Sequence, residues 1–226
     1  MVASDLDAAE RRVIDDLGVE LCFRDPGVAA FGLHNALFPV GDQLLEVVSP
    51  TQPGTTAGRQ LDKRGGDSGY MVILEVEDLD ALRARFAAHD ARIVYTAEVP
   101  GIVGLHLHPA DVGGAILSVD QTDEWGEWPW AGPEWRSHVV TDRVAEVLAV
   151  QIDADDPRAM AARWGKLLGI EPTGDEQTTV VLPDGGEVRF VDAGGGAEGV
   201  SGFELRAASP EHRGQTTICN CRFDIV

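Results

Sequence analysis

The composition of this 226-residue chain excludes several classes of protein before any motif is considered. With 44% hydrophobic residues the chain can bury a globular core, and it has neither an apolar run long enough to span a membrane nor a secretory leader after Met1. The formal net charge of −20, from 38 acidic and 18 basic residues, argues against nucleic acid and anionic membrane surfaces as partners, and we expect a cytoplasmic protein.

A helix signature occurs three times along the chain, beginning at Asp5, Asp78 and Asp156. Each aspartate can accept hydrogen bonds from the free N–H groups of the first helical turn. The apolar residues that follow are spaced three and four positions apart, which places them on one helical face. The predicted core positions are Leu6, Ala9, Val13 and Leu17, then Leu79, Leu82 and Phe86, and finally Pro157, Met160, Trp164 and Leu168.

Apolar segments of strand length surround each helix, which predicts a βαβββ unit repeated three times. The strand before each helix is expected at residues 1–3, 70–76 and 147–152. The strands after the helices are expected at 19–23, 32–40 and 44–48, at 91–97, 102–108 and 115–119, and at 178–182, 187–191 and 202–206. Residues 217–226 are expected to form a final strand, which places Cys219 and Cys221 on one face. The two cysteines are either ordinary strand residues or a metal-binding pair.

The repeats divide the chain into three parts. Residues 1–122 hold the first two units as one domain, residues 123–136 form a linker rich in Trp and Pro, and residues 137–226 hold the third unit with the final strand. A lone third unit leaves a sheet edge and an apolar face open. Either the final strand covers the third unit, or two chains pair through it as a homodimer.

Glu46 is the first residue at which we expect chemistry. It interrupts the apolar strand formed by residues 44–48, where an ionised carboxylate is costly to desolvate unless a positive, protic or metallic group meets it. If Gly41 and Asp42 form a two-residue hairpin turn, Asn35 shares the face of Glu46. A bulge or a longer loop places His34 there instead, so both residues are candidates for a cavity wall.

Two histidines are the other candidates. His106 and His108 are two positions apart in the predicted strand 102–108, so both imidazoles are expected on one face. Together with Glu46 they would form a set of two histidines and one carboxylate that suits iron, manganese or zinc. Alternatively, His108 is a turn residue bonded to nearby backbone and His106 lines a cavity or is a satisfied core residue. Contact with a ligand without a metal is the third reading.

The helices that open on Asp-Leu-Asp, and the Gly-Leu-His-Asn-Ala-Leu strand that leads into Leu-Leu-Glu-Val-Val, resemble the vicinal oxygen chelate superfamily and especially its bacterial glyoxalase-like domains. The resemblance implies an α+β fold in which tandem βαβββ units form a U-shaped open barrel, here with a third βαβββ unit. It also implies a small-molecule ligand and, in the enzymes, a divalent metal such as zinc, iron, manganese or nickel.

The resemblance further implies that paired units supply a histidine from the first strand and a glutamate from the fourth. Glu46 matches the fourth-strand position of the first unit. The corresponding positions of the second unit are Met71 and Ser118, and those of the third are Ala149 and Glu204. Ser118 is therefore expected at the cavity without being a metal ligand.

Two functions follow from these residues. The first is a metal-dependent lyase, isomerase or dioxygenase that acts on a small oxygenated metabolite, with Glu46 and His106 as catalytic groups and Glu46, His106 and His108 as metal ligands. The alternative is a metal-free small-molecule binding protein of the antibiotic-sequestering type, with His34, Asn35 and Ser118 at the same cavity. A structural or regulatory module is a third hypothesis.

Overall fold

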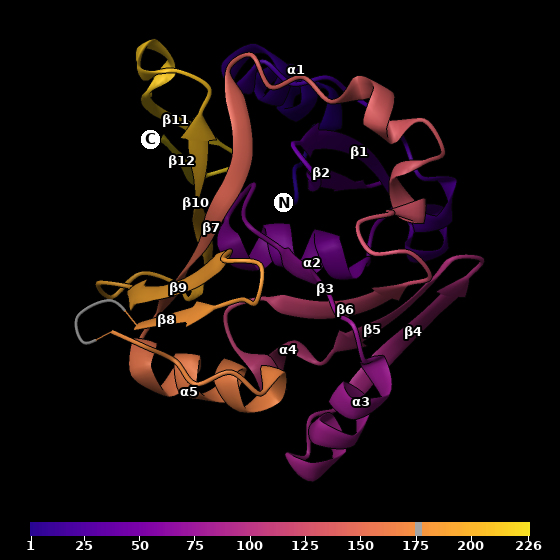
Figure 1. Cartoon of the computed structure of the whole chain (residues 1–226), viewed down its shortest axis with the longest axis vertical. Helices are drawn as coiled ribbons and strands as arrows, with labels where there is room; N and C mark the ends of the chain where they lie inside the picture. Colours follow the sequence, from indigo (N-terminus) through magenta and orange to yellow (C-terminus); the bar gives the residue numbers. More distant parts are fainter. Residues whose placement is uncertain (175–177) are drawn as a thin grey trace. The chain divides into compact units, whose positions relative to one another are not determined.

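The structure, a computed structural model, describes residues 1–174 and 178–226 (Figure 1). These residues form two compact units, each drawn from separate parts of the chain. Unit 1 comprises Met1–Tyr70, Trp130–Leu148 and Ser201–Val226, and unit 2 comprises Met71–Pro129 and Ala149–Val200. This division differs from the consecutive division at residues 1–122 and 137–226, because most of the third repeat belongs with the second repeat and not with the C-terminal strands.

All three predicted helices are present, and each begins at the predicted aspartate. They are α1 (Leu6–Leu17), α3 (Leu79–Ala88) and α5 (Pro157–Leu168). The capping bonds run from the N–H of Ala8 to Asp5 at 2.9 Å, from Ala81 to Asp78 at 2.8 Å and from Ala159 to Asp156 at 3.0 Å. Every core position predicted for α1 is buried, whereas α3 and α5 each bury two of their predicted positions.

The predicted hairpin in unit 1 consists of β1 (Leu33–Val40) and β2 (Gln43–Pro50). Its register pairs Val40 with Gln43 and Leu37 with Glu46, as a two-residue turn requires. Gly41 in that turn has a φ of 65°, and a Cβ there would lie 2.5 Å from the carbonyl oxygen of Ala145. Glycine is therefore needed at this turn both for its backbone conformation and for the close approach of neighbouring backbone.

Two strands expected in the first repeat are reduced to isolated bridges, one at Phe23 and two at Val2, so those predictions are wrong. Residues 19–23 contribute one bridge through Phe23, and residues 1–3 contribute Val2 alone. Soon after Phe23 the chain turns into the 3₁₀ helix η1 (Pro26–Phe31), whose proline cannot donate a ladder hydrogen bond. The β1–β2 hairpin is therefore the main strand structure of the first repeat.

The two faces of this hairpin pack against different helices. One face meets α1 in a buried cluster that includes Phe38 and Val47. The other face packs near α2 (Thr56–Arg64) in a smaller cluster that includes Leu33 and Val48. The sequence did not predict α2. The face opposite α1 also carries Asn35 and Glu46, so these polar side chains lie beside the apolar contacts with α2.

The final strand predicted from the sequence is two strands, β11 (Gly214–Ile218) and β12 (Cys221–Ile225), paired antiparallel. Cys219 and Asn220 form the turn between them, with φ values of 49° and 55°. Cys219 therefore does not lie on a strand face with Cys221, and that prediction is wrong. Positive φ is uncommon for cysteine, which is why the turn was not recognised.

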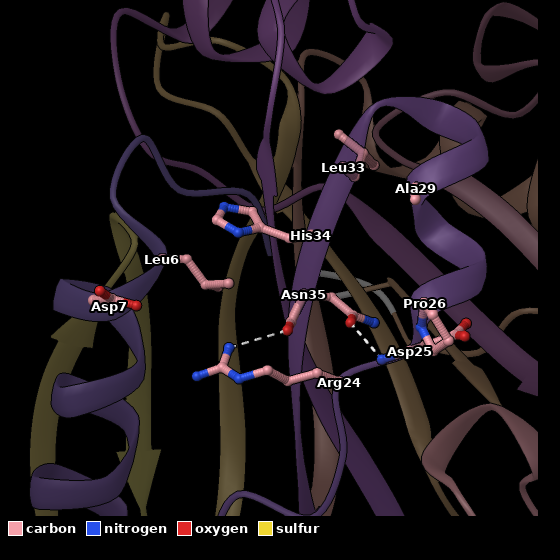
Figure 2. Close-up of a pocket in the computed structure, with 9 residues that line it drawn as sticks. All are labelled: Leu6, Asp7, Arg24, Asp25, Pro26, Ala29, Leu33, His34 and Asn35. Carbon is pink, nitrogen blue, oxygen red and sulfur yellow. Dashed lines mark hydrogen bonds between the residues drawn. The ribbon is translucent and has the colours of Figure 1, made fainter.

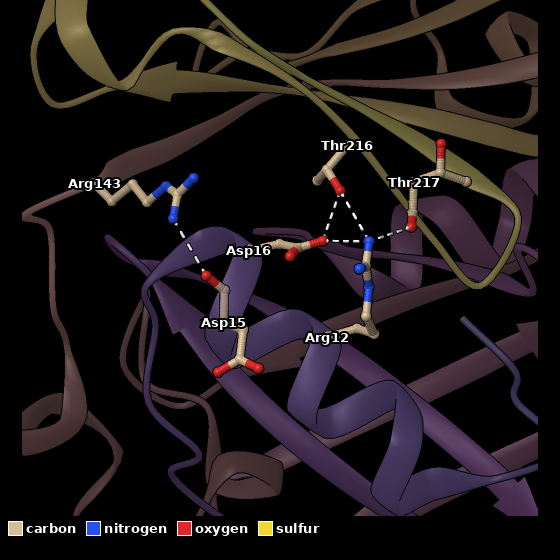
Figure 3. Close-up of polar contacts among 6 residues, drawn as sticks. All are labelled: Arg12, Asp15, Asp16, Arg143, Thr216 and Thr217. Carbon is tan, nitrogen blue, oxygen red and sulfur yellow. Dashed lines mark hydrogen bonds and ion pairs between the residues drawn. The ribbon is translucent and has the colours of Figure 1, made fainter.

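Polar contacts join α1 to β11 within unit 1 (Figure 3). Arg12 and Asp16 form an ion pair at 2.6 Å, and the Thr216 hydroxyl donates to Asp16 at 2.6 Å. Arg12 also donates to the hydroxyl of Thr216 at 3.2 Å. Because Arg12 is largely exposed, these contacts orient the helix more than they stabilise it.

The second repeat in unit 2 has the full predicted βαβββ order. Its strands are β3 (Met71–Glu75), β4 (Ile93–Val99), β5 (Ile102–Leu107) and β6 (Ile116–Thr122), and the short helix α4 (Pro109–Val112) precedes β6. The sheet order is β3-β6-β5-β4, with β3 and β6 parallel. The α+β fold class with βαβββ repeats is therefore confirmed.

The third repeat uses β7 (Val144–Ala154), β8 (Thr178–Val181) and β9 (Glu187–Asp192) with α5. Here the first strand, β7, pairs parallel with β9, whereas in the second repeat the first strand, β3, pairs parallel with the last strand, β6. The next strand, β10 (Gly199–Ala207), pairs parallel with β12 and is followed by the 3₁₀ helix η4 (Pro210–His212). A parallel pair of strands, β10 and β12, thus occurs again at the end of the chain.

The predicted linker contains two short 3₁₀ helices, η2 (Pro129–Ala131) and η3 (Trp135–His138). Trp135 is buried, whereas Trp125 is exposed. Among the described residues, no helix has both the length and the apolar character needed to cross a membrane.

Candidate functional site

Glu46 lies on β2 with its side chain on the hairpin face that does not pack against α1. The residue is half-buried. Desolvation raises the pKa of its carboxyl group, and this effect exceeds the lowering by a hydrogen bond from Asn35 and by the nearby terminal ammonium group. Glu46 therefore holds a proton more strongly than an ordinary glutamate.

Asn35 fixes the orientation of Glu46. Its Nδ2 donates to Oε1 of Glu46 at 2.6 Å, and its Oδ1 accepts from the backbone N–H of Asp25 at 2.8 Å. Because a backbone N–H can only donate, the amide oxygen must face Asp25 and the NH₂ group must face Glu46. Asn35 is 2% exposed, so this arrangement is shielded from solvent.

The structure confirms that Asn35, and not His34, shares the face of Glu46. His34 is exposed on the other face. Across residues 1–174 and 178–226, Asn35 is the one hydrogen-bond donor to the Glu46 carboxylate, and it uses Oε1. The second oxygen, Oε2, is left for a ligand or a proton.

Tyr70 is a neighbouring group that the sequence analysis did not single out. Burial raises the pKa of its phenol to about 12, with the charge of Glu46 adding to the shift and that of Arg59 opposing it. At neutral pH the phenol therefore keeps its proton and can act as a donor. Its position at the start of a predicted apolar strand did not indicate that its phenol would be a partly buried hydrogen-bond donor near Glu46.

A polar cluster lies in unit 2 on the sheet face away from α3. Its members are Gly104, His106, Ser118 and Asp120, which we call the β5–β6 cluster. At the start of α3 the N–H of Leu79 donates to Oε1 of Gln121 at 2.8 Å, and Gln121 lies one position from Asp120 on β6, so its side chain is on the opposite face of the strand from the cluster. The Ser118 hydroxyl donates to Asp120 Oδ1 at 2.6 Å, and both residues are buried.

His106 pairs across the ladder with Ser118, and its ring centroid lies 5.2 Å from that of Tyr95. Desolvation lowers the pKa of the imidazole, which favours the neutral form. A neutral imidazole can accept a proton at one nitrogen and donate at the other. His106 is therefore suited to acid–base chemistry within unit 2.

His108 lies outside the strand, because β5 ends at Leu107 and His108 caps α4. Its Nδ1 accepts from the N–H of Ala110 at 3.1 Å. The expectation that His106 and His108 point to one strand face is therefore wrong, and His108 has the backbone-bonded turn position given as the alternative. Pro109 after His108 ends the strand because it has no N–H to donate.

The predicted metal ligands do not come from one unit, since Glu46 belongs to unit 1 and both histidines belong to unit 2. In the part of the chain that the structure describes, no group of three or more His, Cys, Asp or Glu side chains is arranged to hold a metal ion. The groups that act on Glu46 are the Asn35 amide, the terminal ammonium group and the Asp25 carboxylate, with the Tyr70 phenol nearby. Asp25 is the one further carboxylate in this set, which falls short of the three or more His, Cys, Asp or Glu ligands of a typical divalent metal site.

A cleft of about 350 Å³ lies in unit 1 between the start of α1, the Arg24–Asp25 turn, η1 and β1 (Figure 2). We call it the η1 cleft. Its apolar lining comes from Leu6, Pro26, Ala29 and Leu33. Its polar lining comes from Asp7, Arg24, Asp25, His34 and Asn35. Both predicted cavity residues of the first repeat, His34 and Asn35, thus line one cleft, whereas Ser118 belongs to unit 2.

No protein-family model and no curated protein sequence matches the chain. Several solved structures are similar to it. A hypothetical protein from Staphylococcus aureus has a TM-score of 0.68 at 12% identity, over 92% of this chain and 91% of its own. A mutant of 4-hydroxymandelate synthase from Streptomyces coelicolor has a TM-score of 0.67 at 13% identity, over 90% of this chain and 68% of its own.

Methylmalonyl-CoA epimerase from Mycobacterium tuberculosis is 26% identical over 54% of this chain and 84% of its own, with a TM-score of 0.47. That structural similarity is too low to support an argument. The first two structures cover nearly the whole chain, so they establish its fold and leave its reaction open.

Proposed function

Because the chain has the fold of the vicinal oxygen chelate superfamily, to which 4-hydroxymandelate synthase belongs, we propose that it acts on a small oxygenated metabolite and that Glu46 transfers a proton in the reaction. The observation that carries this proposal is the half-buried Glu46 carboxyl group, whose pKa is raised and whose Oε1 is held by Asn35. A raised pKa brings a carboxylic acid closer to the neutral range in which it exchanges protons efficiently.

The proposed step is proton transfer at a carbon beside a carbonyl group. Oε2 of Glu46 takes the proton from the carbon, the C–H bonding electrons form a carbon–carbon double bond, and the π electrons of the carbonyl group move to its oxygen to give an enolate. Return of the proton to the same or the neighbouring carbon completes an epimerisation or isomerisation. The protonated phenol of Tyr70 is a second proton donor in unit 1.

The proposed proton transfer does not need a metal ion, because the described residues around Glu46 do not supply enough ligands to hold a divalent metal. The zinc, iron, manganese or nickel expected from the resemblance would need ligands besides Glu46. His106 and His108 are the predicted ligands, but His108 already uses Nδ1 to cap α4.

The alternative function is metal-free binding of a small molecule. The η1 cleft favours it, because its volume is at the lower end of ligand sites and its lining combines apolar and polar side chains. A binding protein would retain its ligand without exchanging a proton.

The test is deuterium exchange in D₂O, followed by ¹H NMR with a panel of small 2-hydroxy ketones, 1,2-dicarbonyl compounds and 2-oxo acids. We expect the protein to remove the proton beside the carbonyl in at least one class, and Glu46→Gln to slow the exchange by about 100-fold or more. The assay is run with a chelator and with each added divalent metal.

The matched control is Glu98→Gln, the same substitution at an exposed strand position of β4. It should leave the exchange rate unchanged. Equal rates for Glu46→Gln and the unaltered protein would overturn the role of Glu46. Saturable binding without exchange in any class would instead favour the binding function.

A further inference from the structure

The η1 cleft contains polar groups that the proposed proton transfer does not use (Figure 2). Most already have protein partners. Arg24 donates to the backbone carbonyl of Asn35 at 3.3 Å and pairs with Glu10. The amide of Asn35 is occupied at both ends, and Asp25 Oδ1 accepts from the N–H of Gly27 at 2.7 Å.

Two side chains of the cleft remain without a hydrogen-bond partner among the described residues, namely Asp7 and His34. Both are exposed. Asp7 is not needed as the cap of α1, since Asp5 already accepts from the N–H of Ala8. The imidazole of His34 extends from β1 into the space beside Leu6 (Figure 2).

The charge balance of the cleft is negative. Glu10 compensates the guanidinium of Arg24, which leaves the carboxylates of Asp7 and Asp25. An anionic ligand would meet both carboxylates and find no uncompensated positive side chain in the lining. A positively charged ligand would gain an ion pair with Asp7, and His34 could exchange a hydrogen bond with it.

We propose that the η1 cleft binds a small organic cation, an ammonium group attached to a short apolar body. The ammonium group pairs with Asp7, and the apolar body lies against Leu6, Pro26 and Leu33. His34 contacts a hydroxyl or N–H group on the same ligand. Glu46 does not line this cleft, and although Asn35 both lines it and holds Oε1 of Glu46, the binding of the cation does not require the proposed proton transfer. The proposal rests on the alternative binding function and specifies its ligand.

The test is an NMR titration of the whole chain at pH 7 and low salt with three probes of similar size, which are n-butylammonium, n-butanol and butyrate. We expect n-butylammonium to shift the backbone resonances of residues 6–7 and 24–35 with a millimolar Kd. Butanol should bind more weakly, and butyrate should give no saturable shift at these residues.

Asp7→Asn should weaken n-butylammonium binding about threefold to fivefold, the effect expected of an exposed ion pair. The matched control is Asp15→Asn, which removes the same charge from an exposed position of the same helix and should change the Kd less than 1.5-fold. Ala29→Phe fills the cleft and should abolish saturable binding. Glu46→Gln should leave the Kd unchanged, which separates this site from the proposed reaction.

Equal weakening by Asp7→Asn and Asp15→Asn would show non-specific attraction to an acidic protein and would overturn the proposal. Saturable binding of butyrate at the same residues, or full binding by Ala29→Phe, would also overturn it. Circular dichroism of each variant confirms that the fold is retained before its Kd is compared.

Discussion

β2 in unit 1 and β6 in unit 2 hold the same place in the repeat, yet they support their carboxyl groups differently. On β2, Glu46 receives its hydrogen bond from Asn35 on the adjacent strand and stays half-buried. On β6, Asp120 receives a hydrogen bond from Ser118 on its own strand and is 3% exposed. Asp120 also lies against the backbone of Gly104, where no side chain intervenes.

The difference shows how a carboxyl group on the last strand of a repeat can be available for chemistry or committed to structure, although Asp120 lies two residues beyond Ser118, the counterpart of Glu46. A donor on the adjacent strand holds one oxygen of Glu46 and leaves the other for a ligand. The Ser118 hydroxyl and the space over Gly104 enclose Asp120, so that carboxyl group contributes to the packing of the sheet. Substitutions at the two supports test this distinction.

The largest effect is expected from Gly104→Ala. A Cβ at this position would lie 2.8 Å from Oδ1 and 3.1 Å from Cγ of Asp120, which is buried and cannot move aside without losing its bond to Ser118. We expect a loss of about 2 to 3 kcal/mol in the free energy of unfolding, measured by chemical denaturation.

The control is Gly214→Ala in β11, where a Cβ would meet no atom within 4 Å. Its free energy of unfolding should change by less than about 0.5 kcal/mol. Similar values for the two variants would show that Asp120 is not packed as closely as the contact at Gly104 implies.

A smaller effect is expected from removing the amide support of Glu46. Asn35→Ala leaves the N–H of Asp25 and the carboxyl of Glu46 without their partner, and we expect it to cost about 2 kcal/mol in the free energy of unfolding. It should also raise the pKa of Glu46 further, because the lost hydrogen bond lowers that pKa in the native protein. Denaturation and NMR titration of the Glu46 side chain measure the two effects.

Ser118→Ala in unit 2 is the matched comparison. It removes one hydroxyl donor from Asp120 and should cost about 1 kcal/mol. A double-mutant cycle between Asn35→Ala and Glu46→Leu should show coupling. Additive costs in that cycle would contradict the direct support of Glu46 by Asn35.

The smallest effect is the pH dependence of stability. The pKa of Glu46 is raised above its ordinary value of 4.5, so its favourable contribution is present below that value and is lost as pH rises through the higher folded-state pKa. Glu46→Gln lacks this loss. Its free energy of unfolding should therefore improve relative to the unaltered protein as the pH rises above 4.5, measured by urea denaturation at a series of pH values.

The pKa of Asp111 is shifted in the opposite direction, so its effect on stability changes with pH in the opposite sense. Its hydrogen bonds with Arg92 lower its pKa below 3.8, so its contribution is present above that value and is lost as pH falls. Arg92 is largely exposed, so Asp111→Asn should change stability only slightly, and only above about pH 4. Parallel pH profiles for the Glu46 and Asp111 variants would contradict these assignments.

The sequence predicted the parts of the fold that depend on local signals. The aspartate caps of α1, α3 and α5 and the apolar spacing behind them are confirmed. The register that places Leu37 opposite Glu46 follows from the Gly41–Asp42 turn, and it correctly gave Asn35 as the neighbour of the glutamate. For α2, the capping signals Thr55 and Gly65 were present in the sequence but were not recognised.

The parts that were missed depend on residues distant in the chain. Nothing local to β9 shows that it pairs with β7, and nothing local to Asn35 shows that Asp25 will hold its amide oxygen. The burial that raises the Tyr70 pKa likewise comes from tertiary packing. Asp120 was missed because the predicted strand 115–119 ends one residue before it, whereas β6 continues to Thr122 and places Asp120 on the face of Ser118.

The interleaving of the two units in the chain has a consequence for folding during synthesis. Unit 1 contains both Met1–Tyr70 and Ser201–Val226, so its N-terminal hairpin emerges from the ribosome long before β11 and β12, the strands that share its core. Unit 2 lies between them and can be completed first. Until β11 and β12 are made, the cluster that the hairpin shares with α1 lacks these partners, so some of its apolar surface stays exposed while unit 2 forms, and such surface favours aggregation of a partly folded chain.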